Sequence, residues 1–153
     1  MNLSNIKNHY SVVIVGSGLA GLYAALNFPS DVDILMLSKK ERHQSNSSLA
    51  QGGVACVLDL ENDSYELHIE DTLIAGKREN DIEAVTQLVE EGPADVLKTI
   101  EYGVEYDRDE NGELIKTLEG GHCRRRIVHH KDTSGKEMVD KLVLAVEKLP
   151  NVT

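Results

Sequence analysis

The sequence predicts an α/β protein built on a Rossmann-like β-α-β unit with a parallel sheet. An apolar run over residues 12–15 meets a glycine-rich turn, and an Ala- and Leu-rich stretch over 19–28 follows with helical character. A second apolar run over 32–37 comes at the distance expected for the next parallel strand. Added helices and a small hairpin are expected in the rest of the chain.

The glycine turn is the first chemically informative feature. Gly16, Gly18 and Gly21 follow the spacing G-x-G-x-x-G, in which the first glycine permits a tight turn, the second lets backbone approach a pyrophosphate and the third lets the helix pack on the strand. The helix that starts there directs its positive dipole end at phosphates. The strand–turn–helix context favours an adenine dinucleotide site, and the alternative is a structural turn in another kind of α/β protein.

Length and charge limit the classes of function. The chain has 153 residues, 27% of them charged, and a formal net charge of −10, which disfavours nucleic acid and anionic membranes as partners. No apolar run is long enough to cross a bilayer and no signal-peptide pattern occurs, so we expect a cytoplasmic protein. Cys56 and Cys123 match no metal or redox spacing, so we expect two reduced thiols and no metal site.

A polar segment follows the second strand. Residues 41–48 include Arg42 and carry many small hydrogen-bonding side chains, and they lead into Gly52 and Gly53. The segment predicts either backbone held close to a ligand or a flexible surface loop. Where dinucleotide-binding strands usually end in an acidic residue that binds the ribose, Ser38 and Lys39 stand instead, which disfavours an ordinary NAD site.

Helix signals occupy the middle of the chain. Ser64 and residues 80–83 predict helix starts, and the first of these helices should end near Gly76. The pair Gly92-Pro93 predicts a break between the second helix and a third. A hairpin with its turn over 109–112 and a last helix capped through Ser134 should follow. Residues 1–9 are expected to form a loose tail.

The stretch over 119–127 is the second chemically informative feature. Glu119, two glycines, His122 and three arginines at 124–126 precede a short predicted strand over 126–129. Arginine forks suit carboxylate or phosphate ligands, but the same run can also pair with acidic surface residues. The adjacent His129 and His130 point to opposite sides of a strand, which disfavours a shared metal ion.

Five segments together carry a family resemblance. Gly-Ser-Gly-Leu-Ala-Gly at 16–21, Leu-Ser-Lys at 37–39, Ala-Gln-Gly-Gly-Val-Ala at 50–55, His-Ile-Glu-Asp-Thr-Leu-Ile-Ala-Gly at 68–76 and Glu-Gly-Gly-His-Cys-Arg-Arg-Arg-Ile at 119–127 resemble the L-aspartate oxidase family. That family is grouped with the flavoprotein subunits of succinate dehydrogenase and fumarate reductase. Asn46 stands where the respiratory enzymes carry a flavin-linked histidine, so the resemblance implies noncovalent FAD.

The resemblance also implies site residues. Glu119 is the implied catalytic-site residue and would receive the substrate's ammonium group, which favours an amino acid over succinate. Ser17 to Ala20 would line the pyrophosphate, Lys39 would lie near the adenosine and residues 46–53 would wrap the flavin. The full set of expected cofactor-binding residues is Gly16, Ser17, Gly18, Leu19, Ala20, Gly21, Ser38, Lys39, Asn46, Ser47, Ser48, Leu49, Ala50, Gln51, Gly52 and Gly53.

The implied reaction is oxidation of L-aspartate to iminosuccinate by FAD, with dioxygen or fumarate as the electron acceptor and quinolinate synthase downstream in NAD synthesis. Substrate-binding Arg and His residues, a capping domain and a helical domain would lie beyond residue 153, so we expect an N-terminal part of an FAD domain that is inactive alone. Two alternatives stay open: a fumarate reductase or succinate dehydrogenase type of flavoprotein with noncovalent FAD, and a non-enzymatic nucleotide-binding module.

Overall fold

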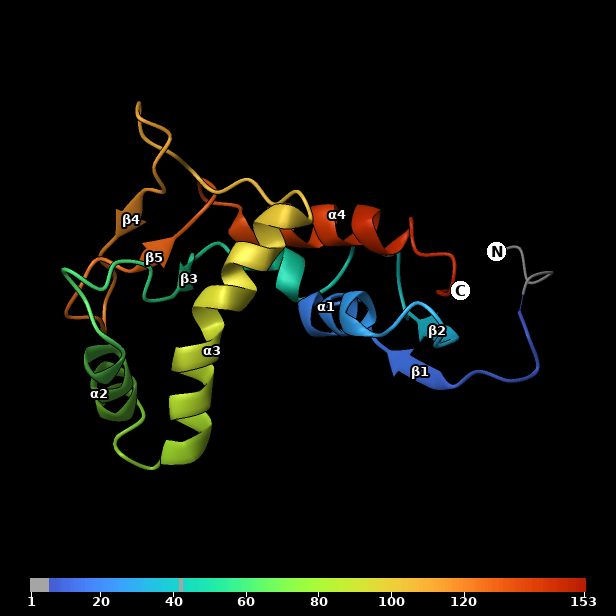
Figure 1. Ribbon diagram of the computed structural model, residues 1–153, viewed down its shortest axis with the longest axis horizontal. Coiled ribbons are helices and arrows are strands. Elements are labelled where there is room, and N and C mark those ends of the chain that lie inside the picture. Colours follow the sequence, from blue (N-terminus) through green and yellow to red (C-terminus); the bar gives the residue numbers. More distant parts are fainter. Residues whose placement is uncertain (1–5, 42) are drawn as a thin grey trace.

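The computed structural model describes residues 6–41 and 43–153 (Figure 1). The molecule is elongated, with a parallel sheet near its N- and C-terminal ends and a second, antiparallel sheet at the opposite end. Of the predicted N-terminal tail, residues 6–9 are exposed and irregular, while residues 1–5 and Arg42 lie outside the described residues.

The predicted β-α-β unit is confirmed. Strand β1 (Val12–Val15) pairs in parallel with β2 (Ile34–Leu37), and helix α1 (Leu19–Asn27) connects them. Val152 forms a parallel bridge to Ile34 on the side of β2 opposite β1, so the residues around Val152 lie where a third parallel strand of the sheet would pair. Within the described residues β1 therefore has β2 as its single neighbour and lies at the sheet edge.

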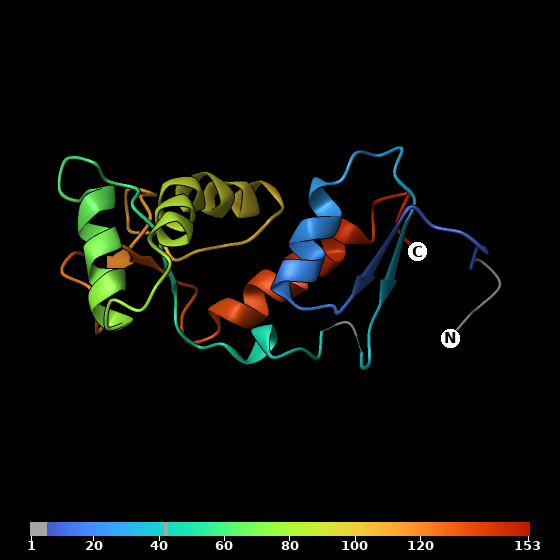
Figure 2. The ribbon, with the colours of Figure 1, turned by 90° about the horizontal axis from the view of Figure 1, so that it is seen from below.

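Helix α4 (Ser134–Val146) packs on α1 and closes one core. Leu22 and Ala25 of α1 meet the α4 side chains Val139, Leu142 and Val143, all of them buried. Figure 2 shows α1 lying across α4, with β1 and β2 beside them. Burial of these apolar side chains is the main force that holds the helix pair together.

The second sheet has the order β3-β5-β4 and is antiparallel. It consists of β3 (Val54–Ala55), β5 (Ile127–Val128) and β4 (Lys116–Thr117), with helices α2 (Tyr65–Ala75) and α3 (Ile82–Glu101) beside it (Figure 1). A second core joins Cys56 and Val128 to Val96 of α3 and to Met138 of α4. Because α4 contributes to both cores, it fixes the two sheets relative to each other.

The predicted break at Gly92-Pro93 is wrong. Helix α3 runs without interruption from Ile82 to Glu101 with Pro93 inside it. Proline removes one helical hydrogen bond, but here Pro93 is buried and continues the apolar stripe of Val85, Val89 and Val96. Packing of this stripe outweighs the local cost of the proline.

The helix starts are confirmed at α2 and α3. Ser64 accepts a hydrogen bond from the Leu67 N–H, and Asp81 accepts from the N–H groups of Glu83 and Ala84. The predicted cap at Ser134 is wrong, since Thr133 is the N-cap residue and makes no side-chain cap bond. Ser134 is instead buried and its hydroxyl accepts from the His130 N–H at 3.0 Å.

The hairpin turn lies where it is predicted. The Gly112 N–H donates to the Asp109 carbonyl oxygen at 3.0 Å, and Arg108 forms an antiparallel bridge to Leu114. The longer regular pairing follows at β4, which pairs with β5 through Lys116 opposite Val128.

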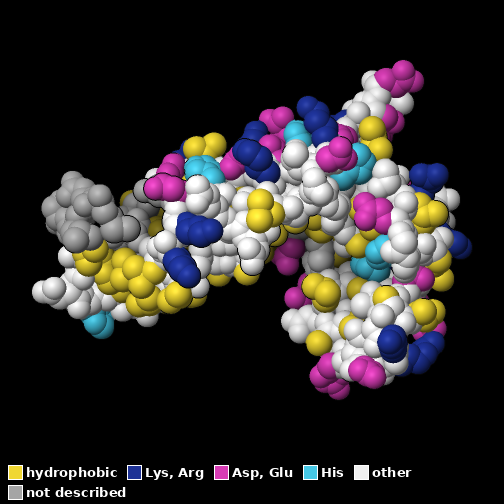
Figure 3. All heavy atoms as spheres, turned by 180° about the vertical axis from the view of Figure 1, so that it is seen from behind, with side chains coloured by type: hydrophobic (Ala, Val, Ile, Leu, Met, Phe, Trp, Pro, Cys, Tyr) yellow, Lys and Arg dark blue, Asp and Glu magenta, His cyan; other side chains and the backbone are white. Residues whose placement is uncertain are grey.

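The surface of the parallel sheet carries exposed apolar side chains. Val13, Val15 and Leu37 are exposed, Val15 by 82%, and Figure 3 shows hydrophobic side chains gathered at the end of the molecule that carries this sheet. Across residues 6–41 and 43–153, no helix has both the length and the apolar character required to cross a membrane.

Candidate cofactor-binding site

The glycine turn after β1 has the geometry that its sequence predicts. Gly16 has a φ of 121°, which side chains disfavour, and its N–H donates to the Leu37 carbonyl oxygen at 2.8 Å. A Cβ atom on Gly21 would lie 2.2 Å from the Gly16 carbonyl oxygen, so only glycine lets α1 start this close to β1. The turn is thereby held between the carboxyl ends of both strands.

The N-terminus of α1 faces a short 3-10 helix, η2 (Ser47–Leu49). The Leu19 N–H donates to Ser47 Oγ at 3.1 Å, and a Cβ atom on Gly18 would lie 3.1 Å from the same oxygen. The first turn of α1 has no acidic residue that would neutralise the positive end of the helix dipole. This end of the helix is therefore suited to an anionic group such as a phosphate.

A cavity of about 730 Å³ lies at this point. Its walls come from the glycine turn, the end of β2, the polar segment and α4, and one rim contact joins Ser17 Oγ to Ser38 Oγ at 2.8 Å. Nine of the expected cofactor-binding residues line it: Gly16, Ser17, Gly18, Ser38, Lys39, Asn46, Ser47, Ser48 and Leu49. The polar segment is thus folded against the glycine turn, as the ligand interpretation of that segment expects.

The remaining expected residues lie elsewhere. Leu19, Ala20 and Gly21 belong to the first turn of α1 and are not among the cavity-lining residues. Residues 50–53 lead away from the cavity into β3, and Gly53 packs so tightly that a Cβ atom there would lie 2.4 Å from the Val128 carbonyl oxygen. A Cβ atom on Gly52 would lie 3.9 Å from Glu119 Oε2, so the structure brings Glu119 to the Gln-Gly-Gly segment.

Six residues that line the cavity were not predicted as site residues: Lys40, His43, Gln44, Ser45, Lys136 and Asp140. Lys136 and Asp140 of α4 line it together with His43, and the Asp140 carboxylate binds both Lys136 Nζ and His43 Nδ1, the latter at 2.8 Å. Gly135 lies next to them, and its N–H donates to the Ala50 carbonyl oxygen at 3.0 Å. An apolar helix stripe predicts a core position for α4, but it gives no signal for these polar contacts.

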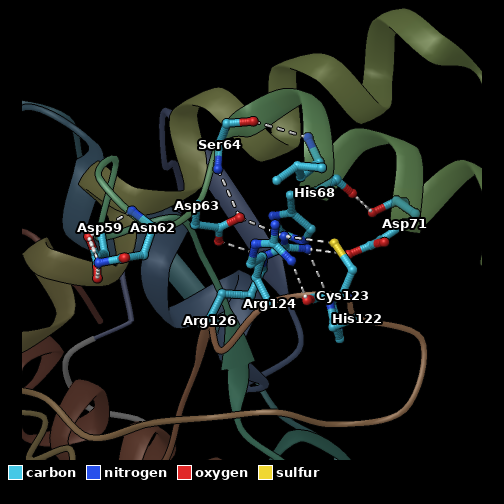
Figure 4. Close-up of polar contacts among 12 residues, drawn as sticks. Asp59, Asn62, Asp63, Ser64, His68, Asp71, His122, Cys123, Arg124 and Arg126 are labelled. Atoms are coloured by element: carbon cyan, nitrogen blue, oxygen red, sulfur yellow. Dashed lines mark hydrogen bonds and ion pairs between the residues drawn. The ribbon is translucent and has the colours of Figure 1, made fainter.

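The arginine run divides into two kinds of residue. Arg124 and Arg125 are exposed, whereas Arg126 is fully buried. Figure 4 shows the Arg126 guanidinium between two carboxylates: its Nε and Nη2 donate to Asp63 at 2.8 and 2.7 Å, and its Nη1 donates to Asp71 Oδ2 at 2.6 Å. The pairing interpretation is therefore correct for Arg126, although the pairs are buried and not at the surface.

Burial alone would raise the pKa of both carboxyl groups. At Asp63 the hydrogen bonds and charge of Arg126 outweigh it and lower the pKa below the ordinary value, and at Asp71 the Cys123 N–H contributes as well. His68, buried beside them, has a pKa lowered to about 4 by burial, by the positive charge of Arg126 and by His122. Asp63, Asp71 and Arg126 are thus charged and His68 neutral at neutral pH.

Comparison with known proteins identifies the class of the site. Residues 11–153 match the family described as FAD binding domain. The chain belongs to this family. FAD is accordingly the cofactor, and the α/β fold is that of FAD-binding flavoproteins.

Curated relatives of this FAD binding domain are L-aspartate oxidases, which confirms the resemblance. The chain is 48% identical to the L-aspartate oxidase of Clostridium perfringens, in a match that covers 96% of this chain and 33% of the relative. It is 44% identical to the L-aspartate oxidase of Acinetobacter baylyi, in a match that covers 99% of this chain and 28% of the relative. It spans about a third or less of the relatives that it matches. The Arabidopsis thaliana relative, 38% identical over 100% of this chain and 23% of its own, is named chloroplastic, so a cytoplasmic location stays a prediction.

Solved structures give the same fold. The E. coli quinol fumarate reductase superposes with a TM-score of 0.90 at 26% identity, covering 94% of this chain and 25% of that one. Mycobacterium smegmatis Sdh1 superposes with a TM-score of 0.84 at 29% identity, and the match covers 89% of this chain and 23% of the Sdh1 chain.

The residues around the cavity fit an FAD. The space where a Cβ atom of Gly16 would stand is open, and Gly18 has only the Ser47 hydroxyl and the Ser45 Cβ nearby, so backbone is accessible to a pyrophosphate. Lys39, Lys40 and Lys136 supply positive charge at the same cavity. In the part of the chain that the structure describes, no cluster of His, Cys, Asp and Glu is arranged to hold a metal ion.

Proposed function

We propose that this chain is the N-terminal portion of the FAD domain of an L-aspartate oxidase. The observation that carries the proposal is the approach of Glu119 to Gly52, which places a carboxylate beside the Gln-Gly-Gly segment expected to wrap the flavin. The identities of 48% and 44% to oxidases support the same assignment. The relatives' greater length supports the view that further domains complete the active site.

In this proposal, separate groups of residues in this chain would bind the cofactor and the substrate. The glycine turn with Ser17, and the segment over 45–49, would hold the pyrophosphate and orient the dinucleotide, while Lys39 would lie near the adenosine. Glu119 would bind the substrate's ammonium group by charge pairing. Asn46 offers no nucleophile for a flavin link, so FAD would be held noncovalently.

FAD held by these residues would supply the two-electron redox chemistry by which L-aspartate loses a hydride from Cα and a proton from nitrogen to give iminosuccinate. The two electrons would end on dioxygen, which becomes hydrogen peroxide, or on fumarate, which becomes succinate. A quinolinate-forming enzyme would consume the product.

The similarity to fumarate reductase favours one second candidate, a noncovalent flavoprotein that reduces fumarate without using aspartate. The complete protein that carries this sequence, loaded with FAD, separates the two. We expect hydrogen peroxide formation that depends on L-aspartate under air. Fumarate reduction by an artificial donor, with no aspartate turnover under either acceptor, would instead support the reductase.

FAD binding itself separates both enzymes from the third candidate, a non-enzymatic module. Flavin absorbance that copurifies and is released by mild denaturation is expected for noncovalent FAD. Flavin that stays attached to the denatured chain would contradict the role given to Asn46.

A further inference from the structure

Asp71 binds the Cys123 backbone N–H in addition to its ion-pair partner Arg126. Its Oδ2 atom accepts from Arg126 Nη1 at 2.6 Å and also from the Cys123 backbone N–H at 2.8 Å. The Asp71 side chain is only 12% exposed. One buried carboxylate of helix α2 is thus bonded to the middle of the loop that begins at Glu119 (Figure 4).

The far end of this loop is fixed by the sheet. The Arg126 carbonyl oxygen accepts from the Cys56 N–H at 3.0 Å, and β5 then pairs with β3, which follows directly after Gly53. The flavin-wrapping glycines and the end of the loop are therefore parts of one rigid unit.

The near end of the loop has fewer contacts. Glu119 is exposed and lies outside any helix or strand, and its carbonyl oxygen accepts from the His122 N–H at 3.2 Å in a tight turn. The His122 ring lies against His68 of α2, with ring centroids 5.5 Å apart. Between this turn and the sheet, the Cys123–Asp71 bond ties the loop backbone to helix α2.

We infer that Asp71 is a positioning residue, which through the Cys123 N–H holds Glu119 against the Gly52 segment where the substrate's ammonium group binds. This inference rests on the proposed function for the role of Glu119. It does not make Asp71 a substrate ligand, because Asp71 Oδ2 accepts from two protein donors and pairs with the Arg126 guanidinium.

Asp63 is the natural comparison for Asp71. It binds the same guanidinium through two oxygens, and its other hydrogen bond is to the Ser64 N–H at 2.8 Å, so its contact with the Glu119 loop is to the Arg126 side chain and not to the loop backbone. If Asp71 served only to neutralise Arg126, loss of either carboxylate would have the same effect on substrate binding.

The test is a double-mutant cycle in the complete FAD-loaded protein, with D71N, E119Q, the double variant and the comparison variant D63N. D71N should raise KM for L-aspartate about tenfold, since a charged hydrogen bond to the loop amide is weakened, and should leave the FAD dissociation constant within about twofold. In the E119Q background the same change should have almost no further effect on KM. Additive effects, or an equal rise in KM for D63N, would overturn the inference.

Amide hydrogen exchange gives a readout that needs no activity. In the wild-type protein the Cys123 amide should exchange slowly, and in D71N it should exchange at least about tenfold faster, whereas E70Q, an exposed carboxylate change on the same helix, should leave it unchanged. If the wild-type protein fails to oxidise aspartate, the proposed function is wrong, and unchanged exchange at residues 119–125 in D71N overturns the positioning role separately.

Discussion

At the scale of single residues, close backbone contacts hold residues 45–50, the end of the polar segment and the two residues after it, in place. Gly135 at the start of α4 lies so near this segment that a Cβ atom there would stand 2.1 Å from the Ser47 carbonyl oxygen and 2.8 Å from that of Ala50. Glycine spacing in a nucleotide-binding motif reveals Gly16, Gly18 and Gly21 from the sequence. Gly135 belongs to no such motif, and its constraint exists only once two distant segments meet.

Gly135→Ala tests this contact. The added methyl group has to displace the backbone of the polar segment, so we expect the free energy of unfolding to fall by about 1–3 kcal/mol and FAD affinity to fall at least tenfold. Titration of flavin fluorescence and chemical denaturation measure the two effects. Gly120→Ala makes the same chemical change in open space and should leave FAD affinity unchanged; equal behaviour of the two variants would contradict the packing argument.

Glu119→Gln tests the charge that the proposed function assigns to the substrate site. Loss of the carboxylate removes a charged hydrogen bond to the ammonium group, which contributes about 1.5–3 kcal/mol, so KM for L-aspartate should rise about 10- to 150-fold. Affinity for succinate, which has no ammonium group, should not fall. Glu113→Gln removes an exposed carboxylate from the neighbouring hairpin and is the control. Steady-state oxidation of aspartate and succinate inhibition constants provide the comparison.

His68 predicts a specific dependence of stability on pH. Its pKa is about 4 in the folded protein, against 6.5 for an ordinary histidine, so between these values the unfolded chain binds a proton that the folded chain does not. Protonation of His68 favours the unfolded chain, so its effect on the free energy of unfolding is most favourable above pH 6.5 and is lost as the pH falls toward 4. The slope is at most about 1.4 kcal/mol per pH unit.

His68→Leu should remove that part of the slope, while a change of the exposed His9 to Gln should keep it. Denaturation midpoints measured between pH 7 and pH 4.5 provide the test. A slope that is the same in His68→Leu as in the wild-type protein would contradict the role of His68 and assign the effect to the neighbouring carboxyl groups of Asp63 and Asp71.

At the scale of whole elements, local signals locate helix starts well when the cap residue is not fully buried. Asp81 and Ser64 cap their helices as the sequence predicts, because each side chain accepts from N–H groups of the first helical turn. Ser134 has a capping pattern too, but burial turns its hydroxyl toward the His130 N–H. Pro93 likewise has a helix-breaking signal that burial of the α3 stripe overrides. Tertiary packing decides both cases, and the local pattern does not contain it.

Asp81→Ala should shorten or fray the start of α3. The side chain accepts from the Glu83 and Ala84 N–H groups at 2.9 and 3.2 Å, and loss of such a cap costs about 1 kcal/mol. Asp81→Asn retains an acceptor oxygen and should lose much less. Thermal unfolding of the three proteins gives the comparison, and equal losses for the Ala and Asn variants would show that the cap hydrogen bonds are not the cause.

At the scale of the whole molecule, the sequence predicts the β-α-β unit and the dinucleotide site because both depend on contacts close in sequence. It does not predict the meeting of α4 with the polar segment, or the buried group of Asp63, Asp71 and Arg126. Those depend on segments far apart in the chain. The arginine run is visible in the sequence, but which of its charges is buried is decided by how α2 packs beside β5.

FAD should therefore stabilise the entire molecule, because its expected cavity joins the glycine turn, the end of β2, the polar segment and α4. At a free concentration of about 100 times the dissociation constant, a ligand specific for the folded state adds about 2.7 kcal/mol to the free energy of unfolding, and removal of FAD should reverse this. Riboflavin lacks the pyrophosphate and the adenosine, the groups for which the turn and Lys39 are suited, so at equal concentration it should stabilise far less. Denaturation midpoints across an FAD titration measure the effect, and equal stabilisation by the two ligands would place the main binding energy outside this cavity.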